Sequence, residues 1–218
     1  MKKVVFLSAI LAASVLVSCG GSEATKTEAS GEAAQATADA VTYKLDSAAS
    51  KVEWFASKIT GKHNGTIPLK GGELKAEGAK LTAGAFSIDV KSLKVVDITD
   101  AKSNGDLTGH LNSPDFFNTA EHPEAKFEII SVEAIENAAA GAANYNVKGN
   151  LTIKGITKAV TFPATIAMDA TQLTANAEFD IDRTEWDIKF GSGKFFPNLK
   201  DKAINDNFKI KLALVAKA

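Results

Sequence analysis

The sequence predicts an all-β fold, an extended antiparallel β-barrel of about eight strands closed by a short helical cap. Apolar and polar residues alternate with a period of two over most of the chain from Val41 onward, as in strands that bury one face. No long amphipathic helix separates the alternating segments, so βαβ units are not expected. Many antiparallel strands with one apolar face close most economically as a barrel or a sandwich.

The alternating segments are joined mostly by short turns rich in Gly, Asn, Asp and Lys. Because consecutive strands are so close in sequence, an up-and-down barrel is favoured. The expected strands cover residues 41–46, 51–59, 66–75, 81–90, 126–135, 145–155, 159–168, 173–182 and 208–217.

One region, residues 97–124, interrupts the alternation and contains the segment HLNSPDFF at 110–117. Ser113 is expected to cap a helix whose first position holds Pro114, with an acidic residue next to it. Residues 106–112 are expected to form another short helix. We therefore expect the insertion to cross one end of the barrel as a cap.

The first 18 residues are typical of a secretory signal peptide. Lys2 and Lys3 precede an apolar run at 4–17, which is too short for a permanent membrane-spanning helix. The run ends in Leu-Val-Ser-Cys, which resembles a bacterial lipobox, so cleavage before Cys19 and lipid attachment at Cys19 are expected. The alternative is an ordinary signal peptide with an incidental cysteine. A lipidated Cys19 would anchor the chain at a membrane.

Residues 20–40 contain no aromatic and no branched aliphatic residue. Such a segment has too little apolar surface to compensate for ordering, so a flexible tether is expected. The chain would then consist of a signal peptide at 1–18, a lipidated cysteine with its linker at 19–40, and a barrel domain at 41–218. The expected location is the bacterial cell envelope, facing the periplasm or the cell surface.

Composition and motif spacing argue against several function classes. The formal net charge is −1, so the basic face of a nucleic-acid-binding protein is not expected. His63, His110 and His122 are far apart in sequence and match no close metal-ligand spacing, so no metal site is assigned.

Two polar motifs are interpreted as structural. Residues 191–194, Gly-Ser-Gly-Lys, match only part of a phosphate-binding loop because Phe195 stands where Ser or Thr is needed, and we interpret them as a flexible hairpin loop. Asp180, Asp182 and Arg183 end an apolar strand, where a structural salt bridge at the barrel rim is favoured over a ligand contact.

Several short blocks occur in the order typical of one protein family. They are Trp54 with Lys58, GKHNG at 61–65, FSID at 86–89, HLNSPDFF at 110–117, HP at 122–123 with KF at 126–127, YNVKGNLTIKGITK at 145–158 and DRTEW at 182–186. Over residues 41–218 the chain resembles the YceI-like family, also described as polyisoprenoid-binding and lipocalin-like. Two departures concern the cap and the last block: Leu-Thr-Gly at 107–109 replaces a charged pair found in many members, and Asp187 replaces a common glycine.

The resemblance implies a long apolar barrel interior that holds an isoprenoid chain, such as a polyprenyl or quinone tail. Alternation alone does not decide between an open and a filled interior. Small inward residues such as Ala164 and Ala175 favour a cavity, whereas large inward residues would fill it. The ligand-binding interior and entrance are assigned to Trp54, Ile88, Leu111, Phe116, Phe117, Phe127, Phe162, Phe179 and Trp186. The polar rim is assigned to His63, His110 and Arg183.

The leading hypothesis is non-enzymatic binding, sequestration or transport of a long apolar lipid in the cell envelope, with no cofactor beyond that lipid. HLNSPDFF would then be a cap, with one phenylalanine in the core and the other at the ligand entrance. The expected partners are the lipid and, through Cys19, a membrane; a homodimer is compatible with the sequence. The alternatives are a structural barrel with a filled core and a lipid-modifying enzyme, for which His110 and Asp182 are the least unfavourable acid–base candidates.

Overall fold

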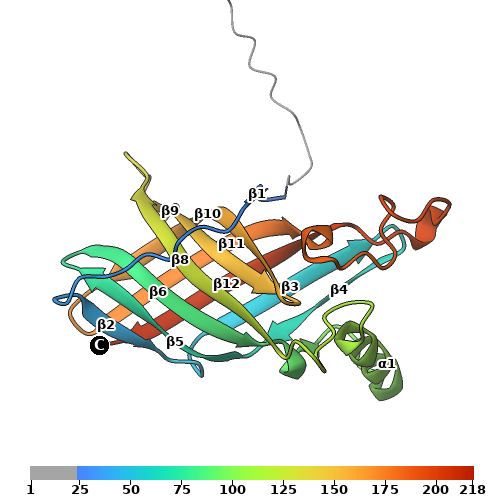
Figure 1. Ribbon diagram of the computed structural model, residues 1–218. Coiled ribbons are helices and arrows are strands. Elements are labelled where there is room, and N and C mark those ends of the chain that lie inside the picture. Colours follow the sequence, from blue (N-terminus) through green and yellow to red (C-terminus); the bar gives the residue numbers. More distant parts are fainter. Residues whose placement is uncertain (1–23) are drawn as a thin grey trace, which may run out of the picture.

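The computed structural model describes residues 24–218, which form a closed eight-stranded antiparallel β-barrel with one α-helix at one end (Figure 1). This confirms the predicted fold class. The expected signal peptide and Cys19 lie outside the described residues. The strands are β1 (Thr27–Glu28), β2 (Val41–Leu45), β3 (Lys51–Lys58), β4 (Gly61–Ile67), β5 (Leu69–Glu77), β6 (Lys80–Asp89), β7 (Lys94–Val95), β8 (Glu124–Ala134), β9 (Tyr145–Ile153), β10 (Ile156–Met168), β11 (Gln172–Asp182) and β12 (Asn207–Lys217).

The barrel is an up-and-down meander. β3 pairs with β4 and β2 pairs with β5, while β12 pairs with both β2 and β3. β2 and β3 therefore share one strand position in the barrel wall, and β4 and β5 share the next. From there β6, β8, β9, β10, β11 and β12 follow, each antiparallel to the one before, and β12 closes the barrel. The strand expected over 66–75 is therefore two strands. They meet at Pro68, which has no N–H to donate to a ladder.

The barrel core contains a chain of phenylalanine rings from β6, β8, β10 and β11. The ring centroids of Phe86 and Phe127 lie 5.3 Å apart, those of Phe127 and Phe162 5.6 Å apart, and those of Phe162 and Phe179 4.1 Å apart in a parallel stack. Phe127 needs the space left by Gly149, because a Cβ on Gly149 would lie 2.2 Å from the Phe127 ring. The chain of rings places aromatic surface across the middle of the barrel.

The helix α1 (Ala101–Asn112) begins and ends at residues other than those expected. The Asp100 side chain caps its N-terminus by accepting a hydrogen bond from the Ser103 amide at 2.8 Å. Ser113 is the C-cap, and its hydroxyl donates to the His110 carbonyl at 2.7 Å. The prediction of a helix starting at Ser113 is therefore wrong, whereas the helix expected at 106–112 is the second half of α1.

Residues 24–40 lie along the outside of the barrel, where β1 pairs with β10 (Figure 1). The Gly31 amide donates to Asn150 Oδ1 at 3.0 Å, Asn150 Nδ2 donates back to the Gly31 carbonyl at 2.8 Å, and the Ala34 amide donates to the Ile129 carbonyl at 2.8 Å. The expectation of a flexible tether is therefore wrong for 24–40. The contacts that hold this segment are mainly backbone hydrogen bonds, which apolar content does not reveal.

Candidate ligand-binding site at the barrel mouth

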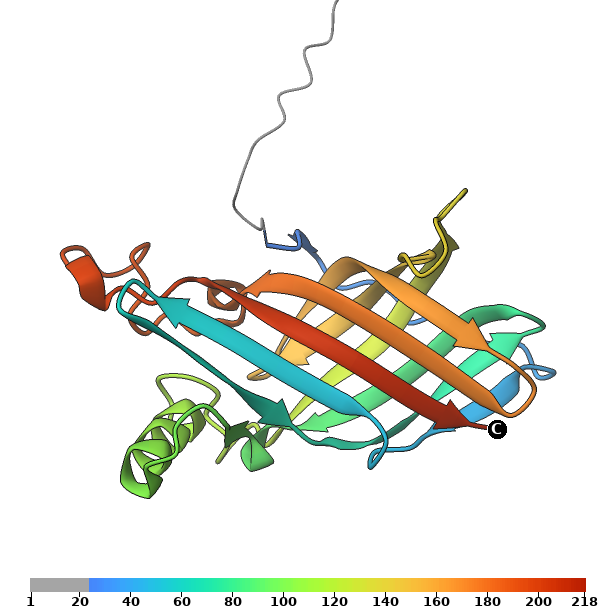
Figure 2. The ribbon, with the colours of Figure 1, turned by 180° about the vertical axis from the view of Figure 1, so that it is seen from behind.

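A cavity of about 650 Å³ lies at the end of the barrel that carries α1. Three elements surround it: the β3–β4 hairpin, the cap formed by α1 with HLNSPDFF, and residues 187–206, here called the mouth loop. Figure 2 shows the cap and the mouth loop at the same end of the barrel, opposite the C-terminus. The volume falls within the range of small-molecule sites. The apolar side chains that line it are Trp54, Ala56, Leu107, Leu111, Phe116, Phe190, Phe196, Leu199 and Ile204.

The cap presents one face of α1 to the cavity. Leu107 and Leu111 are four residues apart, so they lie on the same side of the helix, and both line the cavity together with His110. The His110 ring makes edge contacts with Phe116 and Phe190, with centroid distances of 4.9 and 4.7 Å. These three rings join the cap to the mouth loop.

Arg183 holds the mouth loop from beneath. Its guanidinium is buried and donates to four backbone carbonyls of the loop, at Ile188, Phe190, Ile204 and Asn205. It also pairs with the Asp206 carboxylate at 3.2 Å. Burial lowers the pKa of the Arg183 guanidinium, but arginine remains cationic in proteins. Arg183 is therefore a structural support of the loop, in agreement with the salt bridge favoured for this residue from the sequence, and its assignment to a polar rim facing a ligand is wrong.

Two histidines at the mouth are each paired with an aspartate. His63 Nδ1 lies 2.8 Å from Asp97, and His110 Nε2 lies 3.2 Å from Asp115. Burial raises the pKa of Asp97, but the hydrogen bonds from the Asn64 amide and His63 outweigh it, so that pKa lies below its ordinary value. The pairs fix the orientation of both rings at the cavity edge.

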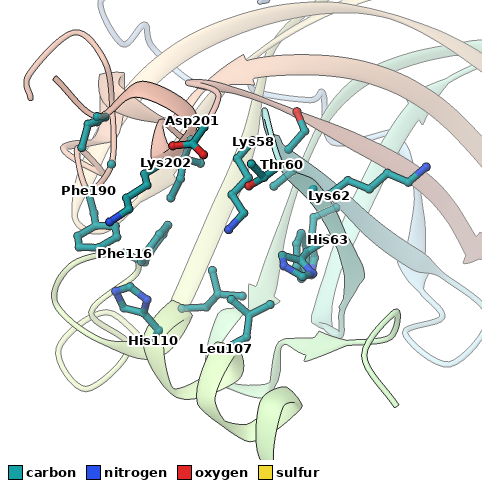
Figure 3. Close-up of a pocket in the computed structure, with 18 of the residues that line it drawn as sticks. Lys58, Thr60, Lys62, His63, Leu107, His110, Phe116, Phe190, Asp201 and Lys202 are labelled. Carbon is teal, nitrogen blue, oxygen red and sulfur yellow. The ribbon is translucent and has the colours of Figure 1, made fainter. Parts of the chain in front are cut away.

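Two lysines add positive charge to the cavity. Lys58 and Lys202 extend their ammonium groups into the space between cap and mouth loop, whereas Lys62 points away from it (Figure 3). Asp201 is the acidic residue among the lining side chains. Within residues 24–218 no group of three or more His, Cys, Asp or Glu is placed to hold a metal ion.

The barrel interior below the mouth is largely filled. Two of the spaces that remain between its side chains measure about 60 and about 30 Å³. Ile88, Phe117 and Phe179 line the larger space, and Phe127 and Phe162 line both. Both spaces are much smaller than the mouth cavity of about 650 Å³. The interior of this conformation therefore does not hold a long chain without side-chain movement.

The residues assigned from sequence divide between these spaces. Trp54, Leu111 and Phe116 line the mouth, and the phenylalanine that follows, Phe117, lines the interior. Trp186 lines neither. It is completely buried and donates from Nε1 to the Leu151 carbonyl at 3.1 Å, so its assignment to a ligand surface is wrong.

Trp54 stands at the inner end of the mouth. On the inward face of β3, Val52 lines the interior while Trp54 and Ala56 line the mouth. The buried Trp54 Nε1 has no hydrogen-bond partner within the described part of the chain, and its ring packs over Gly65.

The mouth loop contributes to the cavity through residues that the alternation pattern does not predict. Phe190, Phe196, Leu199 and Ile204 line the cavity, yet they follow neither strand nor helix periodicity. The available signal was three phenylalanines in a segment without alternation, at 190, 195 and 196. Exposed aromatic residues in a loop indicate a binding surface more directly than alternating ones do.

Comparison with known proteins identifies the family. A model of the YceI-like domain matches residues 43–216. The chain belongs to the YceI-like family. This confirms the resemblance found from the motifs over residues 41–218.

Relatives and solved structures agree with this assignment. A UPF0312 protein of Pseudomonas putida strain W619 is 30% identical over 129 residues, which are 58% of this chain and 62% of the relative, so the match spans less than two thirds of the relative. The crystal structure of BcnA from Burkholderia cenocepacia has a TM-score of 0.59 at 26% identity and covers 79% of this chain and 99% of BcnA. A polyisoprenoid binding domain from Saccharophagus degradans, implicated in plant cell wall breakdown, has a TM-score of 0.56 at 17% identity. The match covers 81% of this chain and 98% of that domain's chain, and it shows a common fold.

Proposed function

We propose that this YceI-like protein binds a long-chain apolar lipid, an isoprenoid or a quinone with an isoprenoid tail, without changing it chemically. The observation that carries the proposal is the mouth cavity of about 650 Å³, whose walls are mostly apolar and which opens at the end of an apolar barrel. The description of the S. degradans relative as a polyisoprenoid binding domain supports this ligand class.

The head group of the lipid would lie at the polar edge of the cavity. Lys58 and Lys202 offer ammonium donors, and His63 and His110 offer ring nitrogens close to them in the cavity lining. A phosphate or a quinone carbonyl accepts hydrogen bonds of both kinds. The tail would cover the apolar wall around Leu111 and stabilise the complex by roughly 25 cal/mol per Å² of buried apolar surface, before ordering costs.

The tail would extend past Trp54 into the barrel only where the interior rings move. Phe117 and the phenylalanine chain occupy the space that a longer tail needs. Ligand entry would therefore be coupled to rotation of core rings.

In the cell, the role consistent with this binding is sequestration or carriage of the lipid in the cell envelope. Lipidation at Cys19 would hold the protein at a membrane, facing the periplasm or the cell surface. The apolar run before Cys19 supports secretion. Among residues 24–218, no helix has both the length and the apolar character required to cross a bilayer.

A second candidate function is a structural or interaction role with a permanently filled barrel. The small interior spaces of about 60 and 30 Å³ favour it. It differs from lipid binding in one measurable respect, because a filled barrel takes up no lipid.

The test is uptake of a polyprenyl phosphate and of a long-tailed quinone from detergent micelles. We expect saturable one-to-one binding by the wild-type protein and a loss of at least about tenfold in Leu111→Trp, because the larger ring occupies space along the wall that the tail would cover. Val41→Trp is the matched control, since Val41 is exposed on β2 and lines no cavity. Absence of uptake by the wild-type protein, or equal uptake by Leu111→Trp, would contradict the proposal.

A further inference from the structure

Large apolar side chains are exposed around the mouth of the barrel. Ile59 at the β3–β4 turn is 77% exposed, and Phe190, Phe195 and Phe196 of the mouth loop are 41%, 45% and 47% exposed. The two segments are neighbours, because Lys58 forms a β-bridge with Ile204. Solubility alone does not favour such a concentration of apolar surface, which typically marks an interaction site.

The same two segments are strongly basic. Residues 58–62 contain two lysines, and residues 189–202 contain four lysines and one acidic residue, Asp201. Lys58, Lys62, Lys200 and Lys202 make no ion pair with any residue from 24 to 218. Lys189 lies over the Phe195 ring, 5.1 Å from its centroid, so positive charge and apolar surface are interleaved.

The chain enters the fold at this end of the barrel. The Thr25 amide donates to the Asp180 carbonyl at 2.6 Å, and the Thr27 hydroxyl donates to Glu185 at 3.1 Å, next to the start of the mouth loop. Cys19 is six residues before Thr25, so it reaches at most about 20 Å from that point. A lipid on Cys19 would therefore hold the mouth end, and not the far end, close to the bilayer.

We propose that Ile59, Phe195 and Phe196, with the lysines around them, form a docking surface for a bilayer that contains anionic lipids. Apolar tips flanked by lysines match the interfacial region of such a bilayer, where aromatic and aliphatic side chains enter the acyl boundary and lysines lie at the phosphates. The mouth loop projects from the end of the barrel, as such insertion requires (Figure 1). The inference rests on the proposed function, for which it supplies a path for lipid between bilayer and mouth.

The test is flotation of the mature chain, with Cys19→Ser to remove the anchor, on vesicles of phosphatidylcholine with and without phosphatidylglycerol. We expect binding to the anionic vesicles that weakens at high salt. The double variant Ile59→Ser/Phe195→Ser should lower the partition coefficient by about tenfold. Neither residue lines the mouth cavity, so the variant should still take up lipid from micelles. Val41→Ser, exposed on β2 away from the mouth, is the control and should bind vesicles as the wild type does.

Absence of binding to anionic vesicles would overturn the docking surface, and so would equal binding by wild type and double variant. A double variant that changes only self-association would indicate a second copy as the occupant and would also overturn it. The protein could also bind vesicles through Ile59 and Phe195 and yet take up no lipid from micelles. That result would support the docking surface and contradict the proposed function.

Discussion

At the residue scale, Arg183 shows how one buried charge positions a binding loop. Its guanidinium satisfies four carbonyls of the mouth loop and the Asp206 carboxylate, so it acts as a rigid multi-donor that lysine could not replace. Arg183 thus holds the cavity wall contributed by residues 190–204 together with the backbone bridges of Ile204 to Lys58 and Ser192.

Arg183→Met is therefore expected to destabilise the protein by about 3 kcal/mol, because the buried carbonyls and Asp206 lose their donor. Chemical unfolding measures the free energy of unfolding. Amide hydrogen exchange should become faster mainly in residues 187–206. The control is Lys189→Met, which removes the exposed pair with Asp187 and should change stability by less than about 1 kcal/mol. An Arg183→Met protein as stable as the control would show that the loop is held by other contacts.

Replacement by alanine should change the stability of the protein in opposite directions at two glycines. A Cβ on Gly65 would lie 1.8 Å from the Lys94 carbonyl and 2.6 Å from Trp54 Nε1, so Gly65→Ala should displace the β4–β7 contact and the Trp54 ring. A Cβ on Gly109 in α1 meets nothing within 4 Å, so Gly109→Ala should stabilise the helix by about 0.5–1 kcal/mol. Melting temperatures of the two variants distinguish them, and a stabilised Gly65→Ala protein would contradict the packing described here.

At the element scale, the carboxylate of Asp182 at the end of β11 pairs with Lys194 of the mouth loop. Burial raises the pKa of Asp182, but hydrogen bonds from Lys194 and Thr184 outweigh it and keep that pKa below its ordinary value. A depressed carboxyl pKa contributes stability above the unfolded-state pKa of about 3.9, and this contribution is lost as the pH falls through the folded-state pKa.

Asp182→Ala should therefore lower the stability at pH 7 by about 1 kcal/mol, a typical value for loss of a capping carboxylate. The difference from wild type should shrink as the pH is lowered below about 3.9. Urea unfolding at pH 7 and at pH 3 measures both values. A difference of the same size at both pH values would mean that the charge of Asp182 has no part in holding the loop.

How far the sequence predicts an element depends on the kind of force that holds it. Strands such as β10 were predicted because burial of one face imposes alternation, as from Val160 to Met168. The start of the helix was predicted at the wrong residue because Ser113 and Pro114 match the local pattern of a helix N-terminus, whereas the N-cap of α1 is Asp100. Residues 24–40 and the mouth loop were missed because backbone hydrogen bonds and a single arginine hold them, and neither leaves a periodic pattern.

At the scale of the whole molecule, the phenylalanine chain separates two interior spaces. Phe162 lines both and stacks on Phe179. Phe162→Ala should destabilise the empty protein by about 3–5 kcal/mol, and lipid should restore more stability to it than to the wild type because the merged space admits a longer tail. Unfolding with and without a polyprenyl phosphate measures both effects.

Phe195→Ala is the control for that experiment. It removes an exposed ring and should change the stability by less than about 0.5 kcal/mol. If lipid stabilised wild type and Phe162→Ala equally, the tail would not pass the phenylalanine chain, and lipid binding would be confined to the mouth.

Native mass spectrometry of the mature protein, purified from its own cell envelope, would show whether the barrel mouth carries a long apolar lipid. We expect a stoichiometric adduct whose extract contains an isoprenoid or long-tailed quinone, and loss of that adduct in Leu111→Trp. A protein that is empty after purification and remains empty after incubation with polyprenyl and quinone lipids would contradict this expectation and would establish the filled, structural barrel instead.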